Sequence, residues 1–159
     1  MSEFIEKKVV KVVFDTAGTD SAGVANTTVA AHPSGVFIPD NAIITRAFYE
    51  VNTTFVSGGA DAGTIGIGVE GVGAGTEDLK VAIAISDAGN VWDAGIHGTL
   101  AGSPALGDDA AHTDAIMWAA LKAASYVKTT GHEEVTFNVA GQVLSAGKLT
   151  LYIEYVVGL

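Results

Sequence analysis

A strict alternation of apolar with small or polar residues, "TIGIGVEG" at residues 64–71, is the sequence feature that most constrains the fold. Ile65, Ile67 and Val69 occupy every second position of this segment. Successive side chains of a strand point to opposite faces, whereas a helix would scatter these three residues around its surface. The segment is therefore predicted to be a β-strand.

The preceding segment, "IITRAFYEVNTTF" at residues 43–55, fits either a helix or a strand by spacing alone. Ile44 and Phe48 fall at helical spacing, while Tyr49 and Val51 lie on one face of a strand. The segment is crowded with β-branched and aromatic residues, which lose side-chain freedom in helices and pack well on a pleated surface. We therefore predict a strand, joined to the next one through the Gly-rich stretch "SGGADAG" as in a hairpin.

Further segments complete the expected architecture. Short runs rich in β-branched and aromatic residues predict additional strands at residues 7–14, 79–85, 125–130, 133–140 and 148–157, with one or two more within 26–42. Residues 86–114 are expected to form a long irregular loop, and residues 113–125 have the composition of a short helix. Seven to nine strands predict an all-β fold, an antiparallel β-sandwich that is jelly-roll-like, with at most one short helix.

A chain of 159 residues is most simply one domain, here a single β-sandwich domain over residues 1–159 with residues 1–8 as a candidate extended N-terminal arm. Within the predicted strand at 79–85, Val81, Ile83 and Ile85 are expected on one face and Lys80 on the other, together with two alanines. The small residues on that second face indicate close cover by another layer or by a neighbouring subunit.

Composition excludes several classes of function. The net charge of −10, with no basic cluster apart from Lys7, Lys8 and Lys11, argues against nucleic-acid binding, because phosphate backbones would be repelled. The absence of cysteine excludes disulfides, thiolate zinc sites and thiol catalysis. No apolar run approaches the roughly 18 residues of a membrane helix, and the charged N-terminal segment does not have the pattern of a secretory signal, so no membrane partner is expected.

Catalytic and ligand-binding patterns are equally sparse. The four histidines lack metal-motif spacing and are expected in solvated loops, and Asp87 and Asp93, with the nearby Asn90, are only a weak candidate for a cation site. The stretch "GVEGVGAGTEDL" lacks the Lys-Ser/Thr ending of a phosphate-binding loop and is expected to connect two strands of a hairpin. The sequence predicts no enzyme activity, no catalytic, cofactor-binding or metal-binding residue, and no cofactor.

Trp92 and Trp118 each lie in a stretch made otherwise of small residues. Tryptophan is enriched at interface hot spots, which makes both residues candidates for an interface. A large aromatic side chain can equally cap the core of a sandwich. The sequence leaves these two alternatives open.

Three phrases taken in order, "AIITRAFYEVNTTFVSGGADAGTIGIGVEG", "KVAIAISDAGNVWDAG" and "EVTFNVAGQVLSAGKLTLYIEYV", resemble small β-rich virion structural proteins of tailed bacteriophages, the capsid decoration and head-associated proteins. The resemblance extends over residues 36–157 and includes no catalytic signature. It implies a jelly-roll-like fold and a non-enzymatic capsid decoration (cement) protein on the outer capsid surface of the virion, made in the host cytoplasm.

The same resemblance implies a homotrimer whose partner is the major capsid protein. The contact is expected in the N-terminal segment, with Phe4 and Ile5, or in the loop at 86–114, with Trp92 and Trp118 as further candidate interface residues. The alternative is a carbohydrate-binding recognition module of a tail tip or fibre, in which the two tryptophans would stack on sugar rings.

Overall fold

The computed structural model describes residues 7–69, 79–99 and 127–157. These ranges contain nine strands and no helix. In chain order the strands are β1 (Lys7–Asp15), β2 (Ala31–Ile38), β3 (Ala42–Ser57), β4 (Thr64–Val69), β5 (Lys80–Ala84), β6 (Gly95–Thr99), β7 (Val127–Lys128), β8 (Glu133–Ala140) and β9 (Leu144–Val157).

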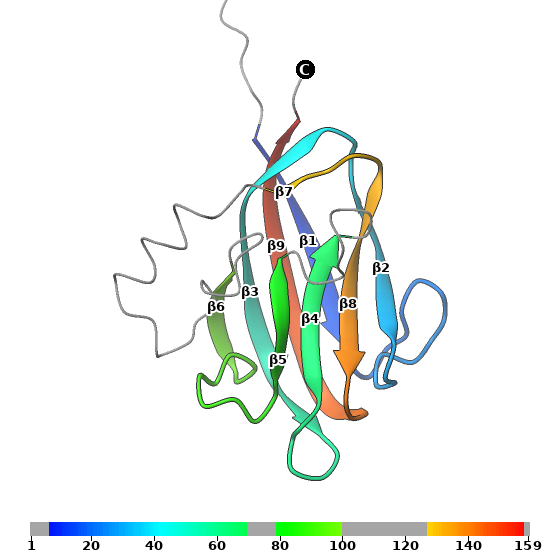
Figure 1. Ribbon diagram of the computed structural model, residues 1–159, viewed down its shortest axis with the longest axis vertical. Coiled ribbons are helices and arrows are strands. Elements are labelled where there is room, and N and C mark those ends of the chain that lie inside the picture. The colour runs from blue at the N-terminus through cyan, green and yellow to red at the C-terminus, as the bar shows by residue number, and fades with distance from the viewer. Residues whose placement is uncertain (1–6, 70–78, 100–126, 158–159) are drawn as a thin grey trace, which may run out of the picture.

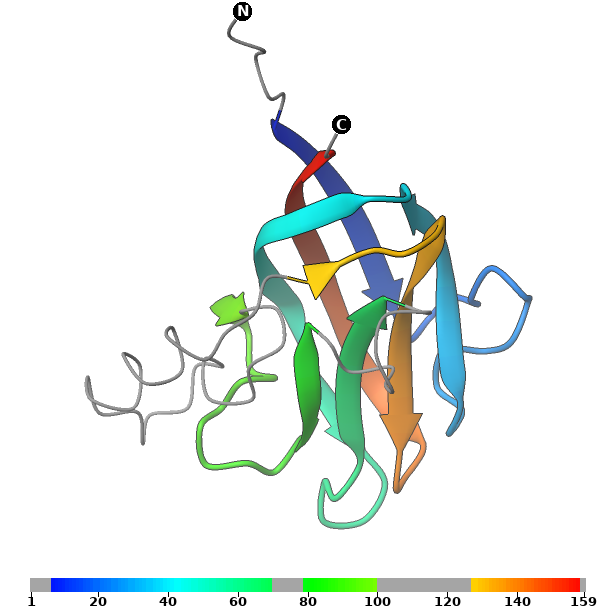
Figure 2. The same ribbon diagram turned by 45° about the horizontal axis from the view of Figure 1, so that its top comes forward.

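The strands form two antiparallel sheets packed face to face (Figures 1 and 2). The larger sheet has the order β1-β9-β3-β6, with the short β7 also paired to β3, and the smaller sheet has the order β2-β8-β4-β5. The pairs are nested along the chain, since β1 pairs with β9, β2 with β8, β3 with β6 and β4 with β5. A long antiparallel ribbon rolled into two layers gives this pairing, which is that of a jelly roll. The predicted fold class is confirmed.

The core lies between the two sheets and is filled by the inward side chains of both. In β3 the residues Ile44, Ala47, Tyr49 and Val51 are at most 2% exposed. A β-bulge between Ile44 and Arg46 adds one residue to the pairing with β9, and this keeps both Ile44 and Ala47 on the buried face. The segment with the ambiguous spacing is therefore a strand, as predicted.

The predicted hairpin between residues 43–55 and 64–70 is wrong. β3 belongs to the larger sheet and β4 to the smaller one, so the Gly-rich connection crosses from one layer to the other (Figure 1). The crossing is held by a polar corner, in which Asp61 Oδ1 accepts from the Ser57 N–H at 2.7 Å and Ser57 Oγ accepts from the Gly63 N–H at 3.0 Å. Alternation identifies which face of each strand is buried but does not identify its partner, and here the two buried faces oppose each other.

Two element boundaries also differ from the sequence prediction. The segment expected to be an irregular loop contains β6, which pairs with β3, and β9 begins at Leu144 rather than at residue 148. By contrast, β4 and β5 pair antiparallel, as the predicted hairpin between them requires. The helix predicted at 113–125 lies outside the described residues.

Lys80 is the exception to the alternation expected for β5. A register irregularity between Ile65 and Ile67 interrupts the pairing of β4 with β5. Lys80 pairs with the inward-facing Ile67, is only 3% exposed, and places its Nζ 5.8 Å from the centre of the buried Tyr49 ring. The predicted placement of Lys80 and Ile83 on opposite faces is therefore wrong, since both pair with inward-facing residues of β4, and the ammonium group lies at a cation–π distance within the core.

Candidate interaction surface

Trp92 is a core residue in this structure. Its side chain is 1% exposed, its Nε1–H donates to the Ile83 carbonyl oxygen at 3.0 Å, and its ring lies 5.5 Å from Tyr49 and 5.9 Å from Phe55 between centroids. The sequence left open whether Trp92 lies in the core or at an interface. In the structure it lies in the core and offers no surface to a partner. The other candidate interface residues, Trp118, Phe4 and Ile5, lie outside the described residues.

The described ranges contain no group of three or more His, Cys, Asp or Glu side chains that could hold a metal ion. Near the weak cation candidate, Asp87 instead closes a turn, because its Oδ2 accepts from the Gly89 N–H at 2.9 Å and its carbonyl accepts from the Asn90 N–H at 3.1 Å. In the same ranges the structure has no helix able to span a membrane.

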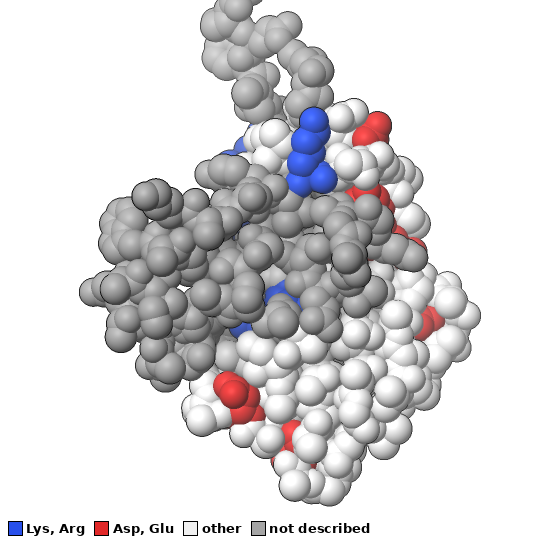
Figure 3. All heavy atoms as spheres, in the orientation of Figure 1, with Lys and Arg blue, Asp and Glu red and all other residues white. Residues whose placement is uncertain are grey.

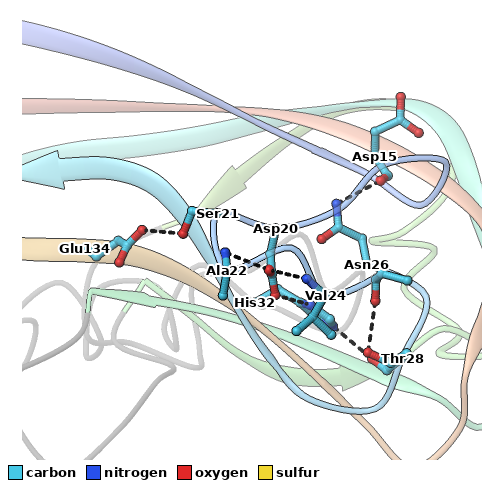
Figure 4. A network of polar contacts seen from close by, with 10 residues as sticks. Asp15, Asp20, Ser21, Ala22, Val24, Asn26, Thr28, His32 and Glu134 are labelled. Atoms are coloured by element: carbon cyan, nitrogen blue, oxygen red, sulfur yellow. Dashed lines mark hydrogen bonds and ion pairs between the residues drawn. The ribbon is translucent and has the colours of Figure 1, made fainter.

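His32 departs from the solvated loop position expected for the histidines, because it lies on β2 with a side chain 1% exposed (Figure 4). Its Nδ1 is 3.0 Å from Asp20 Oδ2 and its Nε2 is 2.8 Å from the Thr28 carbonyl oxygen. Both ring nitrogens therefore lie within hydrogen-bond distance of an oxygen atom. The expectation failed because the partner carboxylate is twelve positions upstream, in a loop that the sequence does not place beside β2.

Asp20 is the centre of the same network. Its Oδ1 accepts from the backbone N–H groups of Val24 at 2.8 Å and Ala22 at 2.9 Å. Burial by itself would raise the pKa of Asp20, but the N–H of Val24, the His32 ring and the N–H of Ala22 together outweigh it and lower the pKa below its ordinary value. The network holds the loop between β1 and β2 against the sandwich, and its role is structural.

The outer face of the larger sheet is the candidate for binding, because it carries exposed aliphatic, aromatic and basic side chains. We call it the outer sheet face and define it by the residues that point away from the core on β1, β9, β3 and β6. Their inward neighbours in sequence, such as Val12, Leu151 and Tyr49, are almost fully buried, so alternation places these side chains on the opposite side. They include Lys7, Val9, Lys11, Val13, Asp15, Ile43, Arg46, Phe48, Glu50, Asn52, Ile96, Lys148, Thr150, Tyr152, Glu154 and Val156.

A stacked aromatic pair forms the centre of the outer sheet face. Phe48 and Tyr152 are direct partners across β3 and β9, with ring centres 5.0 Å apart and planes inclined by 17°. The guanidinium carbon of Arg46 lies 4.9 Å from the centre of the Phe48 ring, and Lys11 is the register partner of Tyr152 on β1. Cations over and beside aromatic rings give this centre both apolar and positive character.

Exposed aliphatic side chains surround the aromatic pair. Ile96 on β6 is 77% exposed, Val9 is 56% exposed and Val13 is 49% exposed. Ile96 and Val13 end the same row across the sheet, because Val13 pairs with Thr150, Thr150 with Glu50 and Glu50 with Ile96. The face therefore combines a central aromatic pair with exposed aliphatic side chains in the rows on either side of it.

The charge of the outer sheet face differs from that of the chain. Four of the eight basic residues lie on it, against three acidic ones, whereas the whole chain carries −10. Two ion pairs neutralise its margins, Lys7 with Glu154 at 3.1 Å and Lys148 with Asp15 at 3.0 Å. Figure 3 looks onto the other sheet, where acidic side chains lie along the right and lower margins. The excess of acid thus belongs to the rest of the chain.

Known proteins share the fold of this chain. The chain matches no protein-family model and no curated protein sequence. Among solved structures, a chain of the cyanophage Pam1 capsid asymmetric unit is 17% identical, with 97% of this chain and 86% of that chain covered and a TM-score of 0.58. A chain of the Ralstonia phage GP4 capsid is 20% identical, with 96% and 86% covered and a TM-score of 0.55. At these identities the similarity establishes a common fold across nearly the whole chain.

Proposed function

We propose that this protein is a virion structural protein of a tailed bacteriophage, and specifically a capsid decoration protein that binds the outer surface of the head. The observation that carries the proposal is the match over nearly the full length of the chain with chains of two phage capsid structures. The sequence resemblance points in the same direction. A rigid sandwich with a developed outer face suits a protein whose role is binding rather than catalysis.

We further propose that the protein acts as a homotrimer and that the major capsid protein is its partner. The acidic excess outside the outer sheet face keeps the protein soluble before assembly, because a net charge far from zero opposes non-specific association. The alternative, a carbohydrate-binding module, loses one of its two candidate stacking residues, since Trp92 is buried.

Capsids assembled from a genome lacking this gene provide the test. Purified protein is mixed with these capsids, and bound protein is measured after sedimentation. Saturable binding with a fixed ratio to the major capsid protein is expected, and failure to bind such capsids would refute the decoration role. Light scattering of the free protein checks the trimer, for which three times the 16.1 kDa of one chain is expected.

A further inference from the structure

We propose that the outer sheet face is the surface that docks on the capsid, and that its partner is a patch of the shell with carboxylates set among apolar groups. The inference rests on the proposed function and adds to it the contact surface and the chemistry of the partner.

The apolar part of the partner follows from the exposed side chains. Ile96, Val9 and Val13 are all about half exposed or more, and the Phe48–Tyr152 pair lies between them. Aromatic residues and arginine surrounded by aliphatic contacts are the composition of interface hot spots. A shell surface that covers this face must therefore supply apolar groups opposite the aromatic pair and these aliphatic side chains.

The acidic part of the partner follows from the charges that the face does not neutralise itself. Lys7 and Lys148 are engaged in ion pairs, whereas within the described part of the chain Lys11, Arg46 and Glu50 are not, which leaves an excess of one positive charge on the face. Both lie beside the aromatic pair, Arg46 on the inner strand β3 and Lys11 on the edge strand β1, so a partner that covers the pair would also remove them from water. A desolvated cation needs a carboxylate opposite it, so the partner is expected to present one or two there.

Charge also favours the shell over a second copy as the occupant. A second copy would present an outer sheet face with the same four basic and three acidic residues, so it offers no surplus of carboxylates to Lys11 and Arg46. Docking on the shell instead turns the acidic remainder of the chain outward and toward neighbouring copies.

Two substitutions that add the same charge at exposed aliphatic positions test the surface. Ile96→Glu lies on the outer sheet face, and Val143→Glu lies at the turn between β8 and β9, where Val143 is 57% exposed. We expect Ile96→Glu to weaken binding to capsids lacking the protein at least about tenfold, and Val143→Glu to change it less than about twofold. Thermal unfolding of both variants checks that each is folded.

Arg46→Gln tests the charge of the partner. It is expected to weaken binding about five- to tenfold at low salt, and the loss should shrink as salt rises, because screening removes the same attraction in the wild type. Equal binding of all three variants and the wild type would overturn the docking surface while leaving the decoration role intact. Failure of the wild type to bind would refute both the decoration role and the docking surface. If Ile96→Glu instead converts a trimer to a monomer, the outer sheet face contacts a second copy of this chain and not the shell.

Discussion

Gly147 on β9 lies against the core ring of Phe55 so closely that no larger residue fits. A Cβ built at this position would overlap the Cδ1, Cε1 and Cγ atoms of that ring. The backbone φ of Gly147 is 142°, a conformation that L-residues rarely adopt. Phe55 cannot move aside freely, since it is 1% exposed and lies 6.1 Å from Phe14 and 5.9 Å from Trp92 between ring centres. Gly147→Ala is therefore expected to disrupt an aromatic cluster.

The expected loss is about 3 kcal/mol of unfolding free energy or more. Overpacking a core costs about 1–3 kcal/mol, and a residue forced into an unfavourable backbone region adds about 1–3 kcal/mol. For a domain of this size each kcal/mol corresponds to about 2–4 °C, so the melting temperature should fall by about 10 °C. Urea unfolding followed by circular dichroism measures the difference directly.

A matched control is available in Gly58, around which nothing lies within 4 Å of a built Cβ and whose φ is not in the positive range. Gly58→Ala should change stability by less than about 0.5 kcal/mol. Combining Gly147→Ala with Phe55→Leu should cost less than the two single changes added together, because the smaller side chain makes room. A cost below about 1 kcal/mol for Gly147→Ala alone would refute the packing explanation.

Three further substitutions test other contacts. Asp20→Asn removes a carboxylate whose pKa is lowered from 3.8 in the folded state. The stability that the carboxylate contributes is fully present above about pH 4 and disappears as the pH falls through the lowered pKa. The difference in unfolding free energy between wild type and variant should therefore be larger at pH 7 and close at pH 2.5. Trp92→Phe loses the hydrogen bond to the Ile83 carbonyl and leaves space in the core, and chemical unfolding should show a loss of about 2–4 kcal/mol. Lys148→Met breaks only a partly exposed pair with Asp15, and the melting temperature should move by less than about 3 °C.

The strands of this fold can be predicted from the sequence because each strand depends on the alternation and composition of neighbouring residues. The alternation of Ile65, Ile67 and Val69 required one buried face, and all three are fully buried. Strand pairing depends on residues far apart in the chain. For this reason the connection after Ser57 was predicted as a hairpin, although it joins two sheets. The same limit applies to Lys80, whose inward position depends on a register irregularity that no spacing in the sequence reveals.

The candidate surface was harder to predict than the fold. Phe48 and Tyr152 are 104 positions apart in the chain, and only the pairing of β3 with β9 makes them neighbours. Trp92 was a candidate interface residue because its neighbours in sequence are small. A core aromatic residue can have the same small neighbours when the side chains that pack against it come from other strands. Exposed valines on β1 gave no signal, because strand composition is similar on buried and exposed faces.

The central position of β9 in the larger sheet has a consequence for how the protein is made. β1 and β3 are both paired to β9, and the Lys7–Glu154 contact joins residues 147 positions apart. A ribosome releases β1 and β3 long before β9 emerges, so neither strand can acquire its main partner during most of synthesis. Until then β3 exposes a long apolar strand edge, which is a hazard for aggregation at high expression. Slow folding that depends on the arrival of β9, and protection by chaperones in the interval, are expected for this chain.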